Sequence, residues 1–136
     1  MSGAPDDISQ KVGEREGITT KARGDWGEAQ VAAYLRKRGC RIVASKYRCR
    51  FGEIDLIARD GKTLCFVEVK MRSNLSFGLP REYVTASKRS KLRTPAEYYL
   101  ATHHIDGACR FDVAEVYTDG AQTPENTRIE YIENAF

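Results

Sequence analysis

Two carboxylates and a lysine with the spacing D-x12-E-x-K stand near the middle of this chain. Asp55 lies in the run GEIDLIA, and Glu68 and Lys70 lie in the run FVEVKMR. Between the two runs is Asp60-Gly61, a dipeptide typical of two-residue hairpin turns. The pattern predicts two antiparallel strands that bring the three side chains together.

The turn sets which residues of the two strands face each other. A turn at Asp60-Gly61 makes Arg59 and Lys62 the closing pair, and this register places Asp55 opposite Phe66. Alternation then gives one face of the hairpin to Glu53, Asp55, Ile57, Leu64, Phe66, Glu68 and Lys70. The other face receives Ile54, Leu56, Ala58, Cys65, Val67 and Val69. Because both faces are largely apolar, we expect the hairpin to be covered on both sides.

Ionised side chains on such covered strands need a partner or a function. Asp55 and Glu68 would repel each other, and loss of water would add to the cost. A divalent cation relieves both problems, and Mg²⁺ prefers one or two carboxylates together with waters and phosphate oxygens. Lys70 could then orient a water or neutralise charge developing on a phosphate. The alternative is a structural ion pair of Lys70 with Asp55 or Glu68.

The elements that must position these residues follow from the periodicity of the flanking sequence. A helical stripe predicts a helix over residues 25–38, with Asp25 and Glu28 spaced as in a capping box. Residues 40–50 are typical of a strand near a sheet edge. A helix is expected from about residue 85 to residue 100, and Pro95 should kink it or divide it in two. Residues 110–117 and 128–132 are typical of strands.

The predicted order is therefore α-β-β-β-α-β-β, an α/β fold with helices packed on a sheet. A length of 136 residues suits one domain, here residues 22–136, after a polar arm over residues 1–21 that we expect to be disordered. No apolar run is long enough to cross a membrane or serve as a signal peptide. The four cysteines lack metal-ligand spacing. We therefore expect a cytoplasmic protein with reduced thiols.

The net charge of +3 hides a strong asymmetry. Residues 36–50 carry seven Lys or Arg and no acid, whereas residues 106–136 carry two Arg against seven Asp or Glu. Segregated positive charge suits an anionic polymer such as nucleic acid. The same clustering could be only a solvated surface.

Beyond the charge, the motifs carry a resemblance. The D-x12-E-V-K hairpin, preceded by a helix with GDWGE, resembles the PD-(D/E)xK superfamily of restriction-endonuclease-like folds. More narrowly, GEIDLI, FVEVKMR and FGLPREYVTASKRSKL make residues 22–136 similar to the bacterial YraN family, which is related to Holliday junction resolvases. The resemblance implies a mixed β-sheet with helices on both faces.

The resemblance also implies roles for individual residues. Glu28 matches the family's helix carboxylate, and Asp55 and Glu68 match its metal-binding pair for Mg²⁺ or Mn²⁺. The Val69 carbonyl would be a further ligand, and Lys70 matches the catalytic lysine. Behind such a site we expect basic residues to contact the backbone of a nucleic acid, most simply DNA; these residues are Arg72, Lys88, Arg89 and Lys91.

Three functions are consistent with these features. The first is Mg²⁺-dependent hydrolysis of phosphodiesters in DNA, with Glu28, Asp55, Glu68 and Lys70 as the site. The second is a module that binds nucleic acid without cleaving it. The third is a protein-interaction factor whose acidic C-terminal segment binds a basic partner. By analogy with resolvases, which cut two strands symmetrically, a homodimer is plausible.

Overall fold

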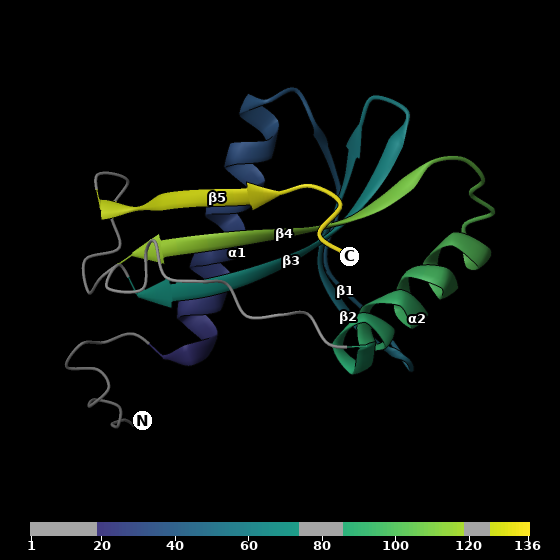
Figure 1. The fold of residues 1–136 in the computed structure, drawn as a ribbon, viewed down its shortest axis with the longest axis horizontal. Helices are drawn as coiled ribbons and strands as arrows, with labels where there is room; N and C mark the ends of the chain where they lie inside the picture. Colours follow the sequence, from purple (N-terminus) through teal and green to yellow (C-terminus); the bar gives the residue numbers. More distant parts are fainter. Residues whose placement is uncertain (1–18, 74–85, 119–125) are drawn as a thin grey trace, which may run out of the picture.

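A mixed five-stranded sheet with one helix on each face forms the fold (Figure 1). The computed structural model describes residues 19–73, 86–118 and 126–136, with only the backbone of residues 86–90. Its elements are α1 (Thr20–Lys37), β1 (Arg41–Cys49), β2 (Gly52–Asp60), β3 (Thr63–Ser73), α2 (Ala86–Thr102), β4 (Cys109–Thr118) and β5 (Arg128–Ile132). This order confirms the predicted fold class.

The strands lie in the sheet in their order along the chain. β3 and β4 are parallel, and the other neighbouring strands are antiparallel. The connection that carries the chain from β3 to the parallel β4 contains α2, as parallel pairing requires. β1 lies at one edge, as predicted. Of the two helices in the described part of the chain, neither combines the length and apolar character that a membrane crossing needs.

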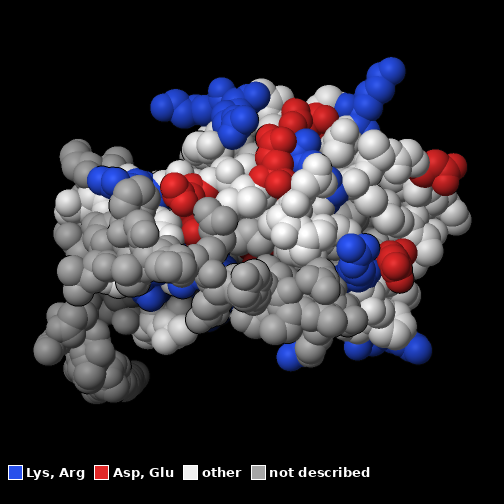
Figure 2. All heavy atoms as spheres, in the orientation of Figure 1, with Lys and Arg blue, Asp and Glu red and all other residues white. Residues whose placement is uncertain are grey.

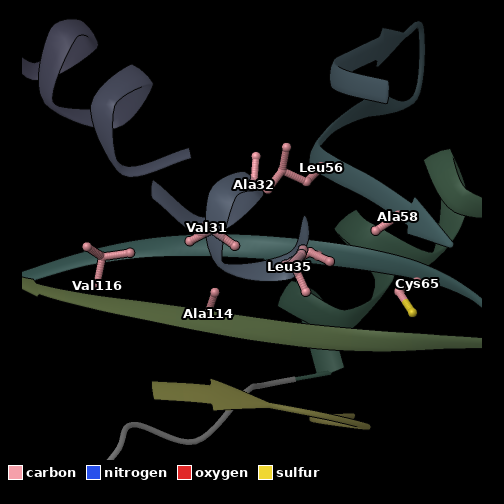
Figure 3. Close-up of a cluster of buried hydrophobic side chains, with 9 residues drawn as sticks. Val31, Ala32, Leu35, Leu56, Ala58, Cys65, Ala114 and Val116 are labelled. Atoms are coloured by element: carbon pink, nitrogen blue, oxygen red, sulfur yellow. The ribbon is translucent and has the colours of Figure 1, made fainter. Parts of the chain in front are cut away.

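Each face of the sheet carries its own hydrophobic cluster. The cluster beneath α1 contains Val31, Ala32, Leu35, Leu56, Ala58, Cys65, Val67, Ala114 and Val116. Figure 3 shows side chains of α1 among those of β2, β3 and β4 in this cluster, with Ala32 beside Leu56. The cluster beneath α2 contains Ile54, Ile57, Leu64, Phe66, Ala96, Tyr99 and Phe111. The expectation that the hairpin is covered on both sides is confirmed.

The first helix begins earlier than its sequence pattern predicts. The side chain of Thr19 caps the helix by accepting a hydrogen bond from the Ala22 N–H at 3.0 Å. The prediction of a capping box at Asp25 and Glu28 is therefore wrong, because both residues lie inside α1. The first two helical residues also overlap the arm predicted over residues 1–21, of which residues 1–18 lie outside the described residues.

The register of the β2–β3 hairpin differs from the predicted one by two residues. Asp60 pairs with Thr63, so the turn is Gly61-Lys62, and the pairing runs on to Leu56 opposite Val67. The Asp60 carboxylate accepts a hydrogen bond from Arg110 of β4 at 3.1 Å, which holds it within the ladder. A shift of two residues leaves each side chain on its face, so Asp55 and Glu68 stay on adjoining strands.

The alternation of faces predicted for β2 is wrong at one point. Ile54 packs beneath α2, but Leu56, two residues later, packs beneath α1. The break falls at Asp55, which is left out of the pairing with β1 together with Lys46. Lys46 has a φ of 53°, in the left-handed region that lysine rarely occupies. The unusual backbone conformation of Lys46 therefore lies opposite Asp55, whereas the register shift between β1 and β2 lies between Ile42 and Ala44.

The expected division of the second helix at Pro95 is wrong, because α2 is one helix from Ala86 to Thr102 with Pro95 inside it, and a kink there stays a prediction. Proline removes one helical hydrogen bond, but the Pro95 side chain is fully buried. A Cβ on Gly52 would lie 3.3 Å from Pro95 and 3.5 Å from the Lys91 carbonyl oxygen. The turn between β1 and β2 thus packs closely on α2 at this proline.

Gly27 sets how closely α1 can approach β3. A Cβ there would lie 2.2 Å from the sulfur of Met71, whereas a Cβ on Gly24 would meet nothing within 4 Å. We predict that Gly27→Val lowers the free energy of unfolding by about 1–3 kcal/mol through overpacking. Gly24→Val should be nearly neutral, because valine has a better helix propensity than glycine. Urea unfolding of both variants tests this, and equal effects would contradict the close-approach role.

Candidate functional site

Asp55 lies at the centre of the candidate site, at the point in β2 where the alternation of faces is interrupted. Its Oδ2 accepts a hydrogen bond from the Val69 N–H of β3 at 2.8 Å. Its Oδ1 accepts none from the described residues. Burial, together with the negative charges of Glu28, Glu68 and Glu53, raises the pKa of Asp55 to about 6 against the lowering effect of the Val69 hydrogen bond. Four carboxylates from three elements are therefore close enough to interact.

Glu68 and Lys70 lie two residues apart on β3, so their side chains share a face of the sheet. Both are half-buried. Among the described residues, neither side chain forms a hydrogen bond or an ion pair, so Lys70 pairs with neither Asp55 nor Glu68. The structure thus lacks the ion pair that the structural alternative requires.

Glu28 reaches the site from α1 and is held there by a residue that the sequence analysis did not single out. Lys46 of β1 donates to Glu28 Oε1 at 2.7 Å and also to Asp25, one helical turn earlier. The Lys46 hydrogen bonds, followed by those of Lys21, lower the pKa of Asp25 to about 2. The i, i+3 spacing of Asp25 and Glu28 indicates that the two acids lie on one side of the helix, but it does not indicate that their partner is a lysine on β1.

Arg72 is engaged by a buried acid of the neighbouring strand. Its guanidinium donates to Glu115 Oε2 at 3.2 and 3.3 Å, and the Tyr117 hydroxyl donates to Glu115 Oε1 at 3.0 Å. Glu115 is 1% exposed, so its charge depends on such partners. In the structure the guanidinium of Arg72 is paired with Glu115. Its role as a phosphate contact stays a prediction.

A second polar network occupies the other end of the sheet. Asp112 is fully buried and accepts hydrogen bonds from Arg110, the Tyr131 hydroxyl and the Asn134 N–H at 2.6 to 3.1 Å. Asp112 and Glu115, two of the seven acids of residues 106–136, are therefore buried within the fold. The acidic segment is therefore less of an open surface than the protein-interaction hypothesis assumes.

Of the three basic residues predicted on the second helix, the structure describes the side chain of one. Lys91 is exposed on α2. Lys88 and Arg89 belong to α2 by their backbone, and their side chains lie outside the described residues.

Binding of a divalent cation at Asp55 stays a prediction, which the chemistry of the carboxylates supports. Asp55, Glu68 and Glu28 offer carboxylate oxygens, the ligands of Mg²⁺ and Mn²⁺, and a cation would offset the repulsion that raises the pKa of Asp55. Within the described residues, no group of three or more Asp, Glu, His or Cys side chains is arranged so that it could hold a metal ion. Mg²⁺ can be held by one or two carboxylates together with waters. Ligation by the Val69 carbonyl stays a prediction.

Known proteins similar to this chain share most of its length. The model of the uncharacterised protein family UPF0102 matches residues 27–116. A UPF0102 protein of Syntrophus aciditrophicus is 46% identical over 83% of this chain and 87% of its own. One from Moorella thermoacetica is 42% identical over 88% and 98%. One from Clostridioides difficile is 41% identical over 88% and 100%. The matched region includes Glu28, Asp55, Glu68 and Lys70.

The raised pKa of Asp55 predicts how the stability depends on pH. Folding raises this pKa from 3.8 to about 6, so the folded state holds a proton that the unfolded state has released. Stability from this group therefore falls as the pH rises from about 4 to about 6. We expect Asp55→Asn, which keeps an acceptor for Val69, to raise the free energy of unfolding by up to about 3 kcal/mol near pH 7 and by little near pH 4.

Urea unfolding of the wild type and Asp55→Asn at these two pH values measures the effect. Glu53→Gln, a change at an exposed carboxylate of the same strand, is the matched control and should have a smaller effect. Destabilisation of Asp55→Asn by ~3–5 kcal/mol near pH 7 would instead indicate a buried ion pair.

Proposed function

We propose a nuclease function for this chain, which belongs to the UPF0102 family. The observation that carries the proposal is the group of acidic side chains around Asp55, at the point in β2 where the alternation of faces is interrupted. A half-buried carboxylate with a raised pKa, Asp55, lies close enough to Glu68 for their charges to interact, and Glu68 and Lys70, two residues apart on β3, have no partners among the described residues. Acids with perturbed pKa values are typical of functional sites. The reaction is hydrolysis of a phosphodiester in nucleic acid, most simply DNA.

Each residue has a distinct role in this proposal. Asp55 and Glu68 would hold Mg²⁺ or Mn²⁺, with Glu28 as a supporting ligand. The Val69 N–H fixes Asp55 through its Oδ2, which leaves Oδ1 for the ion. Lys46 is a positioning residue, because its bond to Glu28 fixes that carboxylate on α1. A ligand held in this way loses little conformational freedom when it binds the ion.

Lys70 supplies the positive charge on the reacting side. Its ammonium group would orient the attacking water and stabilise negative charge that develops on the phosphate. Water adds to phosphorus as one P–O bond breaks, giving a phosphate monoester and a hydroxyl group. The divalent cation, when bound, lowers the pKa of a water ligand and withdraws charge from the phosphate oxygens.

A second candidate function is binding of nucleic acid without cleavage. The exposed cations Arg48, Arg50 and Lys91 favour binding to a polyanion whether or not cleavage follows. A homodimer, expected by analogy with resolvases, stays a prediction that neither candidate requires.

Replacement of Lys70 separates the two candidates. We predict that Lys70→Ala folds and binds DNA like the wild type but loses Mg²⁺-dependent cleavage, because its role is in the transition state. Gel assays on single-stranded, duplex and branched DNA measure this. Lys62→Ala, at the exposed hairpin turn, is the matched control and should cleave normally. If the wild type cuts none of these DNAs with any divalent metal, non-catalytic binding replaces the nuclease hypothesis.

The basic residues of α2 predict a salt dependence. Binding to duplex DNA should weaken with salt at a slope of about −0.9 per phosphate neutralised. Replacement of Lys88, Arg89 and Lys91 together by alanine should flatten the slope by ~2–3 units. Fluorescence anisotropy over a salt series measures both slopes, and an unchanged slope would remove this helix from the binding surface.

A further inference from the structure

Two aromatic rings from distant parts of the chain meet at the surface. Phe51, in the turn between β1 and β2, is 43% exposed, and Tyr98 of α2 is 38% exposed. They are the exposed large hydrophobic residues within the described part of the chain. Their ring centroids lie 5.2 Å apart with an interplanar angle of 60°. The pair forms an apolar patch that the core does not use.

The fold holds this pair in place before any ligand arrives. Gly52, directly after Phe51, has a φ of 137°, which favours glycine, and packs closely on Pro95 of α2. Tyr98 follows Pro95 by three residues, on the same side of α2. The contact of Gly52 with Pro95 therefore positions Phe51 and Tyr98 relative to each other. A preorganised surface of this kind loses little entropy on binding.

The charges around the pair are mainly positive. The guanidinium of Arg50 lies 5.0 Å from the centroid of the Phe51 ring. Also exposed on the neighbouring strand ends and helix are the cations Arg48 and Lys91 and the acids Glu53 and Glu97. Arg48 pairs with Glu53 at 3.3 Å. Figure 2 shows Lys and Arg side chains along the lower right edge, where Figure 1 places the turn between β1 and β2.

The patch is also close to the candidate site along one strand. Asp55 follows Phe51 by four positions, a distance of ~13 Å at 3.3 Å per residue. That distance corresponds to about four nucleotides stacked at 3.4 Å each. One strand of nucleic acid could therefore contact the aromatic pair and the carboxylates together.

We propose that Phe51 and Tyr98 form a stacking platform for an unpaired base, so that the protein selects nucleic acid with a single-stranded segment beside the site. The proposal rests on the nuclease function for the role of the site but concerns binding alone. The exposed faces of these two rings, with Arg50 beside Phe51, match a base with its phosphate, and sequence-tolerant stacking of this kind is common in proteins that bind single strands. A duplex would offer no base faces to these rings.

Binding without metal tests the platform independently of cleavage. In a chelator, fluorescence anisotropy compares a single-stranded oligothymidine with an oligomer of equal charge and length whose sugars lack bases. We expect the wild type to bind the base-containing strand more tightly. Phe51→Ala should reduce this preference by at least about fivefold, and Phe51→Trp should retain it. Arg50→Gln, the matched charge control, should weaken binding to both strands alike.

The outcomes distinguish this proposal from the nuclease function. A thermal melt of Phe51→Ala like that of the wild type establishes that the fold is intact. Loss of preference in that variant supports the platform even if no DNA is ever cleaved. Equal binding of both strands by the wild type, no binding of either, or an unchanged preference in Phe51→Ala would overturn it. The last result would leave the rings as a contact for a protein partner.

Discussion

Negative charge held out of water at Asp55 is the constraint on which this site depends. Burial and the neighbouring carboxylates oppose its ionisation, and the fold keeps it there because hydrophobic clusters on both faces fix β2 and β3. The surrounding elements reduce part of the cost, since Lys46 neutralises Glu28 and the Val69 N–H binds Asp55. What is left uncompensated is the charge that a divalent cation would balance.

The chemistry of the hairpin was predictable from local sequence, but its register was not. Alternation and the Asp60-Gly61 signal were enough to place Asp55, Glu68 and Lys70 on adjoining strands. In the structure the turn lies one position later, and Asp60 is bonded to Arg110, fifty residues later in the chain. A contact of that range leaves no trace in a local pattern. Most side chains of the hairpin keep their predicted faces because the shift was even, but Ile54 lies on the face opposite to Leu56.

Residues whose partners lie on other elements were the ones that sequence analysis misread. Asp25 and Glu28 had the spacing of a helix cap, and their partner proved to be Lys46, in a backbone conformation that no pattern indicated. Pro95 continues α2 because it is buried beside Gly52. The partner of the buried carboxylate of Glu115 is Arg72, which the pairing of β3 with β4 brings beside it.

The central claim is that Asp55 and Glu68 together hold one divalent cation. Electron paramagnetic resonance of Mn²⁺ titrated into the full chain measures bound ions without a substrate. The account predicts one Mn²⁺ bound per wild-type chain, loss of that ion in both Asp55→Asn and Glu68→Gln, and its retention in Glu53→Gln. A wild type that binds no Mn²⁺, or an ion whose binding is unaffected by the first two changes, would contradict it.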